Sequence, residues 1–176
     1  SISTSAATSS AAPTAAGVVG YGYNSSGSPF SMDNCHNYGK VTFNWFETDG
    51  SGTSGRTQVA GVIGAPWGDV TNCNNYGDVT FIAKYKEATA NHLSYIGGIA
   101  GWARIAADTN TAVSTRIMTN CVNYYDLDFS GTNVSNGSKG TLRAGGVAGH
   151  INDEDAHRYW ETISGNKNYG DITFSS

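Results

Sequence analysis

Apolar and polar residues alternate with a period of two in several short stretches of this chain. Val41 and Phe43 flank Thr42, and the same alternation returns in the segments 79–81, 127–129 and 172–174. Because successive side chains of a β-strand point to opposite faces, the pattern predicts strands with an apolar inner face and a polar outer face. Further extended runs are expected over 56–60, 92–97 and 141–145. No long helix is expected.

Two phrases recur four times in the same order. The first is an apolar pair between two glycines, at 17–20, 61–64, 98–101 and 146–149. Glycines flanking such a pair let backbones approach closely or bend at a corner. The second is an Asn-Tyr-Gly turn that leads into the alternating strand, at 37–39, 75–77 and 168–170, with Asn-Tyr-Tyr at 123–125.

The Asn-Tyr-Gly turn has a simple chemical basis. Glycine adopts positive φ at no steric cost, and an asparagine side chain bonds to its own backbone. Tyr125 stands where the other three turns have glycine. A bulky residue with positive φ is an outlier, so we expect the third turn to differ from the others or to carry strain.

The phrases recur with a period of about forty residues, which indicates a stacked or radial repeat architecture. The turn tyrosines Tyr38, Tyr76, Tyr124 and Tyr169 follow one another at spacings of 38, 48 and 45 residues. Fixed motifs joined by connections of variable length favour an all-β fold, a β-solenoid of four repeats, because insertions map to loops on a stacked core. A four-bladed β-propeller is the alternative, since its blades have a similar length.

Four repeats account for most of the chain. They lie near residues 16–55, 56–92, 93–140 and 141–176. Residues 1–15 are rich in Ser, Ala and Thr, and we expect them to form a flexible tail or linker ahead of the repeat domain.

The two phrases together resemble the GLUG-type repeats of bacterial cell-surface and secreted proteins. The best copies are 59–64 with 72–80, and 96–101, and the likeness extends as a framework over about residues 16–174. The resemblance implies a right-handed parallel β-helix in an extracellular, adhesin-like protein. It transfers no catalytic residue.

Composition and charge narrow the range of functions. Only 14% of the residues are charged, against about 25% in an ordinary soluble domain, and the polar positions are filled by Asn, Ser, Thr and Gly. The net charge is −4, and the ten basic residues are scattered, which argues against nucleic-acid binding. No run of 18 or more apolar residues occurs, so no membrane span is expected. This composition is typical of secreted all-β proteins.

Three cysteines occupy the same position of successive repeats. They are Cys35, Cys73 and Cys121, and Asn166 takes their place in the fourth repeat. Equivalent positions stack in a solenoid, so we expect a structural column of small apolar thiols. An odd number cannot form a closed set of disulfides. No companion ligands indicate a zinc site, and no cofactor is expected.

The acidic residues give only weak evidence for a metal-binding or catalytic site. Asp153, Glu154 and Asp155 offer hard oxygen ligands for Ca²⁺, but their spacing does not match an EF-hand loop, so a solvated acidic loop is favoured. Asp78 recurs as Asp126 and Asp171, which suggests an outward-facing device for solubility. The pattern therefore predicts no catalytic residue.

Aromatic residues in or beside the variable connections are candidates for a ligand or partner surface. The candidates are Trp67, Trp102, Tyr159 and Trp160. Flat aromatic rings that project from loops stack on sugars or anchor partners, and the alternative is that they cover the flank of the solenoid. Three Asn-x-Ser sequons begin at Asn24, Asn133 and Asn136, and they are candidate glycosylation sites in a secreted glycoprotein.

These observations predict a non-catalytic structural or adhesive module of the cell surface or extracellular space. Its expected partners are copies of itself, stacked head to tail into a fibre, or other surface proteins and glycans. In such a fibre the residues 1–15 would reach onto a neighbour as an added strand. The alternatives are a carbohydrate-binding module that uses the loop aromatics, and a polysaccharide-active β-helix enzyme with two close carboxylates along a groove.

Overall fold

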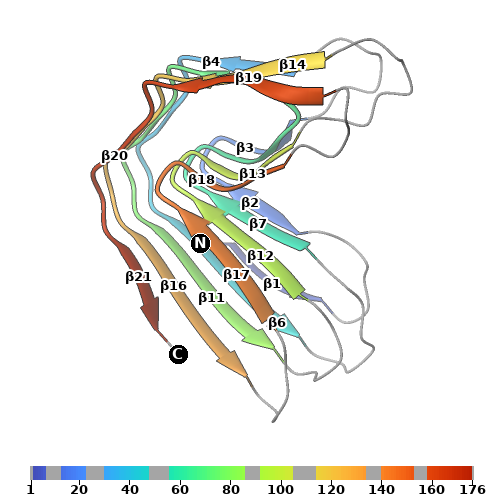
Figure 1. Ribbon diagram of the computed structural model, residues 1–176. Coiled ribbons are helices and arrows are strands. Elements are labelled where there is room, and N and C mark those ends of the chain that lie inside the picture. The colour runs from blue at the N-terminus through green and yellow to red at the C-terminus, as the bar shows by residue number, and fades with distance from the viewer. Residues whose placement is uncertain are drawn as a thin grey trace.

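A computed structural model of the chain is an all-β coil of stacked parallel strands (Figure 1). The structure describes residues 2–6, 13–22, 30–47, 56–85, 92–104, 114–133, 140–152 and 158–175. In this part of the chain the backbone makes four successive turns, which we call rungs, and it forms no helix. Each rung adds one strand to each of five parallel sheets, which we name A to E.

Each sheet contains equivalent segments of all four repeats. Sheet B is formed by β2 (Thr14–Ala16), β7 (Arg56–Ala60), β12 (His92–Gly97) and β17 (Gly140–Gly145). Sheet C is formed by β3 (Val19–Gly22), β8 (Ile63–Pro66), β13 (Ala100–Arg104) and β18 (Ala148–Asn152). Sheet D is formed by β4 (Phe30–Asp33), β9 (Gly68–Thr71), β14 (Ser114–Thr119) and β19 (Arg158–Ser164).

The remaining two sheets complete each rung. Sheet E consists of the two-residue strands β5 (His36–Asn37), β10 (Asn74–Asn75), β15 (Val122–Asn123) and β20 (Lys167–Asn168). Sheet A consists of β6 (Val41–Glu47), β11 (Val79–Tyr85), β16 (Leu127–Asn133) and β21 (Ile172–Ser175), with β1 (Ile2–Ala6) as a fifth strand beside β6. A rung therefore runs through the sheets in the order B, C, D, E and A.

This topology confirms the predicted parallel β-helix and excludes the propeller. A propeller blade is an antiparallel sheet built from one repeat, whereas every sheet here joins strands of different repeats in parallel. Figure 1 looks along the coil with the C-terminal rung nearest the viewer, and the chain turns counterclockwise as it approaches. The coil is therefore right-handed, as nearly all parallel crossover connections are.

The strands of sheet B open the four rungs at Thr14, Arg56, His92 and Gly140. The expectation of a flexible tail over residues 1–15 is wrong for two segments. Ile2–Ala6 forms β1, which pairs in parallel with Phe43–Glu47 of β6. Thr14–Ala16 forms β2, the first strand of sheet B. The Ser- and Ala-rich composition of these segments does not indicate strands, because the pairing of both segments depends on strand edges that later residues supply.

Two apolar cores lie on either side of sheets B and C, which Figure 1 shows between sheets A and D. The first lies between sheets A and B and contains Phe43, Val59, Phe81 and Ile96. The second, which draws on sheets C and D and the corners beside them, contains the residues Met32, Ile63, Val70, Cys73, Ile99, Met118 and Cys121. The predicted inward positions of the alternating strands are thus confirmed in the inner rungs.

Candidate functional site

An asparagine ladder runs along sheet E at the centre of the coil. Its amide-to-amide hydrogen bonds, each from Nδ2 to Oδ1, join Asn37 to Asn75 (2.8 Å), Asn75 to Asn123 (2.7 Å) and Asn123 to Asn168 (2.7 Å). Asn75 and Asn123 are fully buried. A buried amide is costly unless its polar atoms are paired, and the ladder pairs each amide with the next. The ladder has a direction, with an acceptor at its Asn37 end and a donor at its Asn168 end.

Each ladder asparagine also bonds its own turn, as the sequence predicted. Nδ2 donates to the carbonyl oxygen two residues later at 2.6–2.7 Å in all four rungs, and Oδ1 of Asn37 accepts from the backbone N–H of Gly39 at 3.1 Å. The ladder itself was not predicted. Its signal in the sequence is the recurrence of asparagine at the same position of every repeat.

Glycines of the first phrase lie directly against this ladder. The apex glycines of the B-to-C corner are Gly17, Gly61, Gly98 and Gly146, and a Cβ at any of them would overlap the amide of the ladder residue in the same rung. At the first three apices that Cβ would also overlap the carbonyl oxygen of the next corner glycine. The two repeated phrases are therefore the two sides of one contact.

The left-handed backbone conformation occurs at a different position from the one predicted. Positive φ is found at the first residue of the second phrase, at Asn34 (54°), Asn72 (54°), Asn120 (57°) and Gly165 (68°). Asparagine and glycine are the residues that adopt this conformation most readily. Among the described glycines, only Gly165 has positive φ.

The predicted strain at Tyr125 is therefore wrong. Tyr125 needs no positive φ, and its carbonyl oxygen still accepts from Nδ2 of Asn123 at 2.6 Å. Glycine serves another purpose in this turn, because a Cβ on Gly77 would overlap the carbonyl oxygen of Gly39 in the rung before it. The third rung accommodates a side chain there and directs it to solvent.

Turn tyrosines form a stacked column on the outer surface beside sheet E. The ring centroids of Tyr38 and Tyr76 lie 4.9 Å apart, those of Tyr76 and Tyr124 4.8 Å, and those of Tyr124 and Tyr169 5.5 Å. The two outer members are the most exposed, with 74% of Tyr38 and 62% of Tyr169 accessible. The outer ring faces of the column thus point toward the two ends of the coil.

The cysteines form the predicted inward column. Cys73 and Cys121 are buried in the core between sheets C and D, Cys35 is half-buried in the first rung, and all three are free thiols. The neighbouring thiol Cys121 and burial both raise the pKa of Cys73. Burial raises the pKa of Cys35 as well. Cys73 and Cys121 are enclosed by apolar side chains, so this column is structural.

The expectation that Trp102 offers an exposed face from a loop is wrong. Trp102 lies in β13 with 4% of its surface exposed. Its ring stacks on Tyr95 at 5.4 Å between centroids, and the guanidinium of Arg56 lies 4.5 Å above it. Trp67 is half-buried and makes an edge contact with Tyr21 at 5.7 Å. Both tryptophans pack against other side chains of the chain, which matches the alternative that aromatics cover the flank of the coil.

The fourth rung places Arg143 and His150 at the positions equivalent to Tyr95 and Trp102. Arg143 pairs with Tyr95 in the sheet register and His150 with Trp102, and Nη1 of Arg143 lies 2.9 Å from Nε2 of His150. Burial and the charges of Arg143 and Arg56 lower the pKa of His150. His150 therefore remains neutral at physiological pH.

Several predicted residues lie outside the part of the chain that can be described. Asn24, Asn136, Asp153, Glu154 and Asp155 lie beyond the described residues. The side chains of Asn133, Tyr159 and Trp160 are also outside them, although their backbones belong to β16 and β19. In the described ranges, no three His, Cys, Asp or Glu side chains gather in a way that suits a metal ion. Over the same residues, no helix has the length and hydropathy of a membrane span.

The C-terminal face of the coil exposes apolar side chains that the inner rungs bury. Phe174 is 59% exposed and Ile163 is 48% exposed, whereas their register partners Phe129 and Met118 are partly and fully buried. Ile172 and Tyr169 are exposed on the same face.

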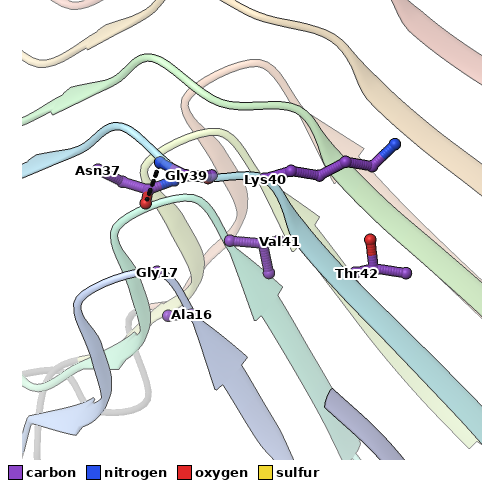
Figure 2. Close-up of a pocket in the computed structure, with 7 residues that line it drawn as sticks. All are labelled: Ala16, Gly17, Asn37, Gly39, Lys40, Val41 and Thr42. Carbon is purple, nitrogen blue, oxygen red and sulfur yellow. Dashed lines mark hydrogen bonds between the residues drawn. The ribbon is translucent and has the colours of Figure 1, made fainter. Parts of the chain in front are cut away.

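A notch of about 240 Å³ opens at the N-terminal face. It is lined by Ala16 and Gly17 of the first corner and by Asn37, Gly39, Lys40, Val41 and Thr42, and Figure 2 shows these residues around it. The notch lies where a rung before the first would pass, beside the part of β6 that β1 leaves uncovered. Its described lining contains Lys40 but no carboxylate.

Comparisons with protein-family models, with curated proteins and with solved structures find no match to this chain. The resemblance to GLUG-type repeats therefore stays a prediction that rests on the two phrases.

Proposed function

We propose that this chain is a non-catalytic structural repeat module of the cell surface or extracellular space, and that its copies associate end to end. One observation carries the proposal, the exposed apolar rung at the C-terminal face. Phe174 and Ile172 are in register with residues that the inner rungs bury. Burying such side chains against another rung is favourable by about 25 cal/mol for each Å² of apolar surface removed from water.

Backbone polarity supports the same proposal. In sheet E, N–H groups of each rung donate to carbonyl oxygens of the rung before, as from Tyr76 to Asn37 and from Tyr169 to Asn123. This polarity directs the N–H of Tyr38 toward the N-terminal face and the carbonyl of Asn168 toward the C-terminal face. The two faces carry complementary groups, so association is head to tail and open-ended.

The composition supports the extracellular setting. Few residues are charged, and Asn, Ser, Thr and Gly fill the polar positions, as in many secreted β-rich proteins. The carbohydrate-binding alternative has weaker support, because the described tryptophans pack against their own chain.

Sedimentation velocity of the full chain over a wide concentration range tests the proposal. We expect the average mass to rise with concentration, and the rise to be lost when Phe174 and Ile172 are both replaced by lysine. Tyr125→Lys is the control, because the exposure of Tyr125, 48%, lies between those of Ile172 and Phe174 but the residue lies on the flank of the third rung. A wild-type chain that stays monomeric at every concentration contradicts the proposal, and circular dichroism verifies that each variant is folded.

A further inference from the structure

We propose that the notch at the N-terminal face is the docking site for the Asn168–Ile172 corner of a second copy, and that Lys40 pairs there with Asp171 of that copy. The inference rests on the proposed end-to-end association and names the contact that sets its direction. The occupant is a second copy because the two faces differ in charge at one position of the rung, the residue that precedes each strand of sheet A.

That position forms a column of unequal charge. The register of sheet A aligns the residues before β6, β11, β16 and β21, which are Lys40, Asp78, Asp126 and Asp171. Neighbouring members of the column are in contact, since Oδ1 of Asp126 accepts from the backbone N–H of Asp171 at 2.8 Å. Like charges on neighbouring strands repel, so an acidic column favours a cation at its open end. Asp171 is exposed at the C-terminal end of this column.

Lys40 supplies that cation at the opposite face. Its side chain is exposed and lines the notch, as Figure 2 shows. A copy stacked at the ordinary rung spacing places its Asp171 directly before Lys40. Stacking two like faces instead keeps Lys40 of one copy away from Asp171 of the other, because the two residues lie on opposite faces. The charge pattern therefore selects head-to-tail docking over both alternatives.

The neighbouring columns continue across the same junction. Oδ1 of Asn37 lies at the acceptor end of the asparagine ladder, and Nδ2 of Asn168 lies at its donor end. Tyr169 of the incoming copy meets the outer face of Tyr38 in the same way as the tyrosines within the column. One pairing is less favourable, because Lys167 would lie before His36 in sheet E.

The strand β1 overlaps the docking path. It pairs with Phe43 to Glu47, whereas β21 of a second copy would pair with Val41 to Asn44, by analogy with its pairing to β16. The two strands compete at Phe43 and Asn44. Docking in full register therefore requires β1 to leave this edge, so β1 shields the face against association. This role is opposite to the bridging role that the sequence suggested for residues 1–15.

Charge reversal in the full chain tests the proposed contact. Lys40→Glu and Asp171→Lys should each raise the concentration needed for association by about fivefold or more, because each places like charges across the junction. Mixing the two variants should restore association, since each supplies the complement that the other lacks. The double variant should also associate at about the wild-type concentration. Lys84→Glu is the control for the change of charge away from the ends.

The outcomes separate this inference from the proposed function. Wild-type association with no effect of either reversal, or with no rescue in the mixture, overturns the Lys40–Asp171 contact while the end-to-end module stands. A monomeric wild-type chain overturns both. Removing residues 1–12 should strengthen association by freeing the β6 edge, and a loss of association in that variant would overturn the shielding role of β1.

Discussion

Gly98 at the inner corner of the third rung lies directly against the buried amide of Asn123. The two residues belong to the two different phrases that recur along the chain. Their contact explains why the phrases always occur together, because the corner can reach the ladder only where the corner residue has no side chain. The same contact is made by Gly17, Gly61 and Gly146 in their own rungs.

This contact predicts the effect of adding one methyl group. Gly98→Ala places a Cβ into the amide of Asn123 and the carbonyl oxygen of Gly146, neither of which can move freely. We expect a loss of about 1–3 kcal/mol in the free energy of unfolding, as for other overpacked interiors. Urea denaturation measures it. Gly20→Ala is the control, since its Cβ would meet only the carbonyl oxygen of Thr14 at 3.7 Å. Equal effects of the two substitutions would contradict the contact.

The asparagine ladder predicts that the loss of stability caused by an Asn→Ala substitution depends strongly on the position of the residue in the ladder. Asn75→Ala leaves Nδ2 of Asn37 and Oδ1 of Asn123 without their ladder partners in a buried setting, so we expect a loss of about 3 kcal/mol. Asn168→Ala should cost about 1 kcal/mol or less, because Asn168 is exposed at the end of the ladder. Both values come from the same urea titration. A larger loss at Asn168 than at Asn75 would show that the ladder is not a buried chain of amides.

The cysteine column predicts unequal thiol reactivity. Cys35 is half-buried, whereas Cys73 and Cys121 are buried, so a thiol reagent should label one residue in the folded chain and all three after denaturation. Because burial raises the pKa of Cys35, its labelling should be slower than that of a free thiol and should accelerate as the pH rises. Rapid labelling of Cys73 or Cys121 in the folded chain would contradict the packing of this core.

His150 predicts a loss of stability in acid. Burial, Arg143 and Arg56 hold its pKa below the ordinary value, so the unfolded chain binds a proton more readily than the folded chain. The free energy of unfolding therefore rises with pH between the pKa of His150 in the folded chain and its pKa in the unfolded chain. It falls as the pH drops below about 6.5. The decrease in melting temperature from about pH 8 to about pH 5 should be smaller in His150→Gln.

The carboxyl group of Asp33 does not contribute to this pH dependence of the melting temperature. Hydrogen bonds from Thr71 and Asn72 lower the pKa of its carboxyl group, which stays ionised over the whole window. An acid sensitivity that is unchanged in His150→Gln would remove His150 as its source.

The sequence predicted the repeat, the parallel coil and the inward columns, because each depends on a local pattern. The alternation around Val79 and Phe81 indicates which side of the strand is buried. The common position of Cys73 and Cys121 in their repeats indicates that the repeats stack on one another. The period of about forty residues joined these observations into one architecture.

The features that the sequence did not predict depend on contacts between distant segments. Nothing near Gly61 indicates that it meets Asn75, and nothing near Ile2 indicates that it pairs with Phe43. The place of Trp102 beside a variable connection predicts an exposed ring, but the ring packs against Tyr95 of sheet B and is buried. Glycine in the Asn-Tyr-Gly turn is the residue that the sequence marks for a positive φ, but Asn72, five residues before Gly77, adopts it.

Electron microscopy and fibre diffraction of the full chain test the central claim, that copies of this coil stack end to end. The account predicts fibres with an axial spacing of about 4.8 Å between strands and a repeat of about 19 Å for each copy of four rungs. Separate particles of single-chain mass at every concentration would contradict it.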